Sequence, residues 1–136
     1  MIGQSFEIPK YDWDVKVYYD VERSDINFCI KQLKKLTSDK YIFEECNKTI
    51  NSKHKNRAYT YSSYITKSSI VFIGVPSSTG ELISTIAHEA NHIKSHIATY
   101  YNINEKGEEV SYLIGDIIKR MSKSFIDFIC NNCLEI

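Results

Sequence analysis

Three residues within one apolar segment have the types and the spacing of a catalytic metal site. His88, Glu89 and His92 form an H-E-x-x-H pattern inside residues 80–101. Residues four apart lie one turn above each other on a helix, so His88 and His92 can offer two ring nitrogens to one Zn²⁺ ion. Glu89 is then close enough to hold and deprotonate a water molecule that the metal activates. The pattern predicts metal-dependent hydrolysis.

The surroundings of the motif favour this interpretation over a merely solvated polar face. A helix over this segment is otherwise rich in aliphatic side chains. Two histidines and a glutamate among so much apolar surface are costly to bury without a function. The apolar positions are Leu82, Ile83, Ile86, Ala87, Ala90, Ile93 and Ile97.

The first half of the chain predicts one strand and one helix, followed by less regular segments. Residues 13–22 alternate as a strand with one buried face does. Residues 24–37 have the spacing of an amphipathic helix. Residues 41–46 fit either a short strand or a turn of helix, and the polar run 48–57 predicts a loop.

The second half contains the elements that must position the motif. Residues 58–65 predict an edge strand, and the apolar run 69–75 predicts a central strand buried on both faces. Ser78 and Glu81 form a capping box that opens the motif helix, and a last helix starts at Glu108. The fold class is therefore α+β: a single domain over residues 1–136, with a small, mostly antiparallel sheet of about three strands packed against the motif helix and two further helices.

Composition narrows the possible functions. The chain has 136 residues, with 17 basic and 17 acidic side chains and a formal net charge of zero. Such a balance gives no electrostatic case for nucleic acid or an anionic membrane as a partner. The first residues lack the pattern of a secretory signal, and no apolar run approaches the ~20 residues of a membrane span. A cytoplasmic protein is expected.

The four cysteines, Cys29, Cys46, Cys130 and Cys133, are expected to be reduced thiols. Cys130 and Cys133 have C-x-x-C spacing, which leaves a zinc ribbon or a redox pair as the alternative. No second pair complements them.

A catalytic zinc site needs a third protein ligand and an open position. Glu108 and Glu109 follow the motif helix after a short connection, so either carboxylate could return to the metal. By angle around the helix, Glu109 lies nearer the apolar face, whereas Glu108 lies on the side of Tyr112 and Gly115. Acidic residues also favour a helix start for electrostatic reasons alone. Position by itself leaves both residues open.

His96 continues the face of the two motif histidines one turn further. It lies about 12 Å along the axis from His88, too far to share one ion in a straight helix. His96 could instead contact the substrate or a ligand residue. The alternative is that it is a plain histidine on the polar face of the helix. His96, Tyr100 and Tyr112 are the possible donors to a transition state, and the sequence does not choose among them.

The segments AHEANHI and GEEVSYLIGDI together resemble the small zincin-like metallopeptidases encoded by phages and prophages of Bacteroides-type bacteria. The resemblance implies a minimal zincin-like domain of the gluzincin type. Alignment of Tyr112, Leu113 and Gly115 with the family pattern implies that Glu108 is the third ligand, with Glu109 as the substitute. The expected function is zinc-dependent hydrolysis of a peptide or protein, with Glu89 as general base. The alternatives are a non-catalytic module of phage origin that acts on a host protein, and a structural protein that binds no metal.

Overall fold

The protein folds around a four-stranded mixed sheet, as shown by a computed structural model. The structure describes the backbone of residues 1–132 and the side chains of residues 1–124 and of Ile126. The sheet order is β1-β2-β4-β3, in which β1/β2 and β4/β3 pair antiparallel and β2/β4 pair parallel. The strands are β1 (Ile2–Ile8), β2 (Trp13–Val21), β3 (Ala58–Ser63) and β4 (Ser68–Gly74).

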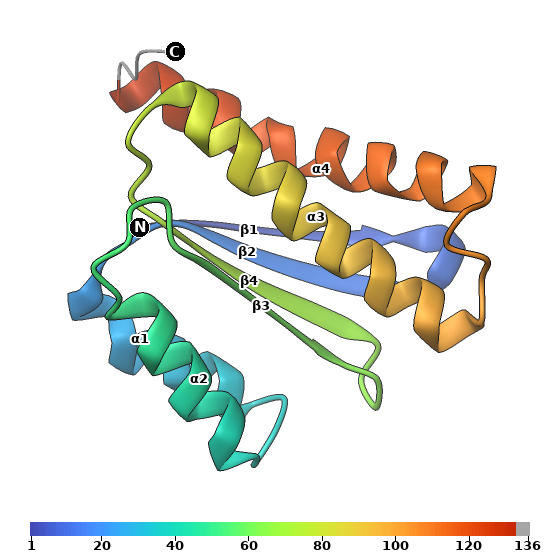
Figure 1. Cartoon of the computed structure of the whole chain (residues 1–136), viewed down its shortest axis with the longest axis horizontal. Helices are drawn as coiled ribbons and strands as arrows, with labels where there is room; N and C mark the ends of the chain where they lie inside the picture. The colour runs from blue at the N-terminus through green and yellow to red at the C-terminus, as the bar shows by residue number, and fades with distance from the viewer. Residues whose placement is uncertain (133–136) are drawn as a thin grey trace.

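Two helices cover each face of the sheet (Figure 1). On one face, α3 and α4 pack over a core that includes Trp13, Val71, Ile93 and Ile117. On the other face, α1 and α2 pack against the sheet through a second core that includes Leu33 of α1, Cys46 of α2 and Phe72 of β4. The helices are α1 (Ile26–Lys34), α2 (Lys40–Ile50), α3 (Thr79–Tyr101) and α4 (Glu108–Asn132), with short 3-10 turns at Pro9–Tyr11 and Arg23–Asp25.

The structure confirms the α+β class and corrects the details of the expected fold. The sheet has four strands rather than about three, because residues 2–8 form an edge strand beside β2. The described residues contain four helices rather than three, because Lys40–Ile50 forms a full helix where the sequence left a short strand or a turn of helix. That helix also occupies the beginning of the expected loop over residues 48–57.

Several expected elements are confirmed. β4 lies in the middle of the sheet and is buried along nearly its whole length, as its apolar sequence predicted. β3 lies at an edge, beyond β4. The Ser78 side chain accepts a hydrogen bond from Glu81 N at 3.1 Å and so caps α3, which ends where Asn102 takes a left-handed conformation.

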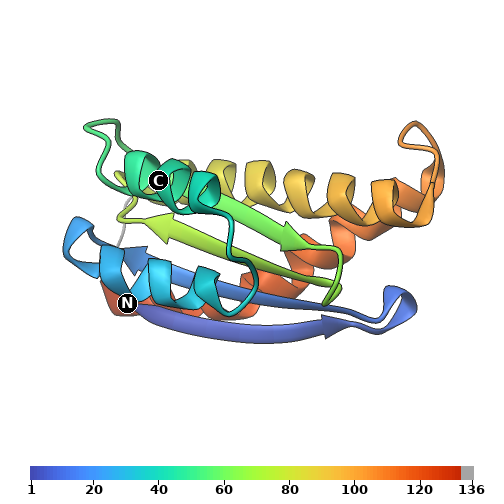
Figure 2. The ribbon, with the colours of Figure 1, turned by 90° about the horizontal axis from the view of Figure 1, so that it is seen from below.

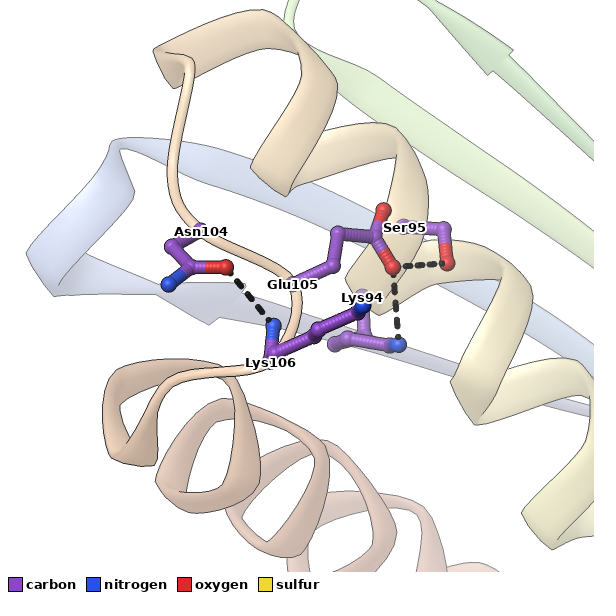
Figure 3. A network of polar contacts seen from close by, with 5 residues as sticks. All are labelled: Lys94, Ser95, Asn104, Glu105 and Lys106. Carbon is purple, nitrogen blue, oxygen red and sulfur yellow. Dashed lines mark hydrogen bonds and ion pairs between the residues drawn. The ribbon is translucent and has the colours of Figure 1, made fainter.

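The loop between α3 and α4 is held against the end of α3 (Figure 3). Glu105 accepts hydrogen bonds from Lys94 Nζ at 3.2 Å and from Ser95 Oγ at 3.3 Å. Asn104 Oδ1 accepts one from Lys106 N at 3.0 Å. These contacts fix where α4 begins, and α4 then runs back beside α3 toward β1.

None of the helices within residues 1–132 is long and apolar enough to cross a lipid bilayer.

Candidate metal centre

The three motif residues converge on one point of α3. The ligand atoms of His88, Glu89 and His92 all lie within 4.8 Å of one another. The Nε2 atoms of His88 and His92 are 3.1 Å apart. Two imidazoles that bind one tetrahedral Zn²⁺ at 2.0–2.1 Å bring their nitrogens to about 3.3 Å from each other. The pair therefore has the spacing of a two-histidine chelate.

The two histidines and the glutamate differ in burial. His88 and His92 are exposed, whereas Glu89 is 4% exposed and lies over the edge strand β3. Thr60 of β3 donates a hydrogen bond from Oγ1 to Glu89 Oε2 at 3.0 Å. Burial raises the pKa of Glu89 above its ordinary value, against the smaller opposing effects of the Thr60 hydrogen bond and the two histidines. A raised pKa suits a general base, because proton transfer is most effective when the pKa of the base lies near the working pH.

Two cavities extend the site in opposite directions along α3. One, of about 280 Å³, lies between α2, β3 and α3 and is lined by Glu45, Thr49, Ala58, Tyr59, Thr60, His88, Glu89, His92 and His96. The other, of about 310 Å³, is lined by Asn56, Ala58, Glu81, Ser84, Thr85, His88 and Glu89. Ala58, His88 and Glu89 border both, so the motif residues lie at the middle of a groove along β3. Figure 2 shows β3 at the edge of the sheet, and Figure 1 shows α3 and α2 on opposite faces of the sheet.

The backbone of β3 offers hydrogen-bonding groups to this groove. Gly74 N donates to Arg57 O at 2.7 Å, and the register continues through Tyr59–Phe72 and Tyr61–Ile70. Hydrogen-bonded pairs alternate in an antiparallel ladder, so the N–H and C=O groups of Ala58, Thr60 and Ser62 point away from β4. Within the described chain, no strand pairs with β3 on that side.

His96 belongs to the same groove. Its ring stacks beside that of His92, with centroids 6.3 Å apart, and its Nδ1 lies 2.6 Å from Ser62 Oγ. Burial and the neighbouring His92 lower the pKa of His96, which favours the neutral ring. The sequence had left a plain polar-face position as an alternative, and the lining of the cavity by His96 favours the substrate or ligand side.

The structure does not bring the predicted third ligand to the histidines. Glu108 is the first residue of α4 and is exposed. From His92 to the end of α3 the helix extends for nine residues, about 13 Å. Glu109, the substitute, accepts a hydrogen bond from Tyr11 Oη at 2.7 Å and pairs with Lys10 at 3.4 Å. The assignment of Glu108 to the metal therefore depends on the family resemblance alone.

The two tyrosines named from the sequence also lie outside the groove. Tyr112 is 76% exposed and lines a separate cavity beside Tyr11 and Glu109. Tyr100 packs its ring against Trp13 and Tyr64, with centroids 5.7 Å and 6.1 Å away. Of the three possible donors, only His96 lines the cavity that contains the motif.

Sequence reasoning missed three groups that contribute to the site. Glu45 of α2 lines the histidine cavity, and its Oε1 accepts a hydrogen bond from Tyr59 at 2.8 Å. Thr60 and Ser62 bond to Glu89 and His96. Alternation along β3 could have shown that Thr60 and Ser62 share a face, but nothing in the sequence shows which helix that face meets. Glu45 could not have been found without the helix that carries it.

The cysteines divide into two groups. Cys29 and Cys46 are free and buried, which confirms the expectation of reduced thiols for these two. The side chain of Cys130 and all of Cys133 lie outside the described part of the structure.

No family model, curated protein or solved structure matches the chain. The function must be argued from the site itself.

Proposed function

We propose that this protein is a small zinc-dependent peptidase of the zincin-like type. The observation that carries the proposal is the pair of histidine nitrogens 3.1 Å apart, next to a buried glutamate that a threonine of the edge strand holds. His88 and His92 would hold the ion, since two exposed imidazoles at this spacing are a donor set that Zn²⁺ prefers. Zinc bound there supplies a Lewis acid that activates water and polarises a carbonyl group.

Glu89 would carry the proton. Thr60 occupies Oε2, which leaves Oε1 to accept the proton of the attacking water and to return it to the leaving amine. Burial of Glu89 excludes competing solvent from this carboxylate and raises its pKa toward the working range.

The groove would bind an extended peptide by strand addition. The outward N–H and C=O groups of Ala58, Thr60 and Ser62 can pair with a peptide main chain, whose scissile bond then lies against His88 and Glu89. The cavities on either side of the motif would hold the parts of the peptide before and after the scissile bond. This pairing gives affinity without a demand for particular side chains, so a library of mixed peptides is the appropriate first substrate.

Glu108 and Glu45 are the two carboxylates to test first as the third ligand. The family resemblance implies Glu108, and the cavity lining offers Glu45. Glu108→Gln and Glu45→Gln, each measured for bound zinc, separate them: loss of zinc in one variant and retention in the other identifies the ligand. Glu109→Gln tests the substitute candidate: its carboxylate is held by Tyr11 and Lys10, so this variant should retain zinc and also controls for a charge change at the start of α4.

Two measurements test the proposed function. Elemental analysis should find one zinc per wild-type chain and strong loss in His92→Ala, with the exposed loop residue His54→Ala as the matched control. Wild type should cleave members of a peptide library, whereas Glu89→Gln should retain zinc and cleave none. A zinc-loaded wild type that cleaves nothing would instead favour the rival, a zincin-like binding module that keeps the groove without the reaction.

A further inference from the structure

A chain of hydrogen bonds leads from the sheet core to His96. Trp13, which is fully buried, donates from Nε1 to Ser69 Oγ at 2.9 Å. Ser69 Oγ lies 2.6 Å from Ser62 Oγ. Ser62 Oγ in turn lies 2.6 Å from His96 Nδ1. The chain spans β2, β4, β3 and α3, and it ends at the groove.

The direction of these bonds follows from counting protons. The indole N–H can only donate, so Ser69 Oγ accepts from it. Ser69 is 2% exposed, and Ser62 is the acceptor that the structure offers to its hydroxyl proton. Ser62 therefore accepts from Ser69, and His96 Nδ1 is the acceptor that the structure offers to the Ser62 hydroxyl proton. The reverse order would leave the buried Ser69 proton without an acceptor.

A histidine that accepts at Nδ1 is neutral with its proton on Nε2. Nδ1 is turned to β3, so Nε2 is the ring nitrogen that remains for a ligand in the groove. The His96 ring lies one helical turn beyond His92, with ring centroids 6.3 Å apart. His88, His92 and His96 line one cavity, so a carbonyl oxygen bound there would approach His96 from the cavity side.

We propose that His96 is the hydrogen-bond donor to the oxyanion that forms during peptide hydrolysis. Trp13, acting through Ser69 and Ser62, is a positioning residue that keeps the proton on Nε2. The donor is thereby oriented before the substrate binds, which is the arrangement that stabilises developing charge most effectively. This inference rests on the proposed peptidase function, and the relay itself can be tested without it.

The relay is tested on the metal-free protein by nitrogen NMR of the histidine rings, of which the chain has four. Wild type should show His96 as the Nε2–H tautomer. Ser62→Ala and Ser69→Ala should give a mixture of tautomers, because the polarity of the chain is then lost. Ser63→Ala, a buried serine of the same strand whose hydroxyl accepts from Thr66 N, should change nothing. An Nδ1–H tautomer in wild type, or no change in the first two variants, would overturn the relay.

The catalytic role is tested on the zinc-loaded enzyme. His96→Leu should retain zinc and lower kcat by about 10²–10³-fold with little change in KM, the range found for loss of one oxyanion donor. His96→Gln, whose amide can donate from a similar position, should recover part of the rate. A His96→Leu rate within threefold of wild type would overturn the role of His96 and leave the peptidase intact. A zinc-loaded wild type that cleaves nothing overturns both functions, while the tautomer measurement still decides the relay.

Discussion

Replacing Glu89 by glutamine should stabilise the metal-free protein while it abolishes catalysis. The Glu89 carboxylate is 4% exposed, and burial raises its pKa above the ordinary value of 4.5. The unfolded chain therefore loses this proton at a lower pH than the folded protein does. Above the unfolded pKa, ionisation costs the folded state more than the unfolded state, and the cost is complete once the pH exceeds the folded pKa. Glutamine keeps an oxygen for the Thr60 hydroxyl and removes the charge.

The size of the effect follows from the contacts of the carboxylate. A buried polar group without full compensation costs about 1–3 kcal/mol. Glu89 is partly compensated by Thr60 and by its two histidine neighbours, so the lower part of that range, about 1–2 kcal/mol, is expected at pH 8. For a chain of this length, the gain corresponds to roughly 4–8 °C in Tm. The difference should disappear near pH 4, where the wild-type carboxylate binds its proton in both states.

Urea unfolding in the presence of a chelator, at pH 8 and at pH 4, measures this difference. Glu44→Gln, an exposed change of the same chemistry on α2, is the control and should leave the free energy of unfolding unchanged. Excess zinc should reduce the advantage of Glu89→Gln, because the cation then compensates the wild-type charge. A variant no more stable than wild type at pH 8, or one equally more stable at both pH values, would refute the argument that burial of the charge is costly.

Three further outcomes can be checked with small experiments. Thr60→Val should lower kcat about tenfold with zinc retained, because a hydrogen bond to a charged group contributes about 1.5–3 kcal/mol and part of it is recovered by water; Thr66→Val is the control. Chelation should lower Tm, and a hundredfold excess of zinc over its Kd should restore about 2.7 kcal/mol of stability, measured by scanning calorimetry. Burial raises the pKa of Cys29 to about 11 and that of Cys46 to about 12. Because the thiolate is the reactive form, both cysteines should resist alkylation at pH 8 in the native protein and react in urea. Mass spectrometry measures the extent of alkylation.

Periodicity predicted the elements that strong patterns mark. Strand β4 and helix α3 were predicted with nearly correct ends. Their burial requires the apolar side chains that make the sequence pattern, so the pattern and the element share the same limits. β1 was missed although Ile2, Phe6 and Ile8 alternate with polar residues, since the segment is only partly buried. For α2 the sequence left a turn of helix only as one alternative, because the four apolar positions of this segment stand among charged and polar residues.

The candidate site was predictable only where it is local. The spacing of His88 and His92 fixes their meeting within one helix, so the sequence predicts it directly. Contacts between Glu89 and Thr60, or His96 and Ser62, join residues about 30 positions apart and depend on strand order. Strands β2 and β4 pair in parallel, which places β3 rather than β2 at the edge of the sheet. Local sequence patterns do not show which strands pair, so this arrangement could not be predicted from them.

Strand order also decides which side of α3 can take part in chemistry. α4 packs beside α3 and over β1, so the side of α3 toward α4 is closed by side chains such as Leu113 and Ile117. The opposite side faces β3, the strand with unpaired backbone groups, and there α3 presents its histidines and Glu89. Any protein group that joins them must then come from β3 and the loop before it, from α2, or from neighbouring turns of α3 itself. The residues that meet this condition include Glu45, Thr60, Ser62 and His96. Glu108 lies on α4 and could reach the histidines only if the start of α4 moved. Zinc content of the Glu45 and Glu108 variants is therefore also a test of whether this arrangement of helices persists when the metal binds.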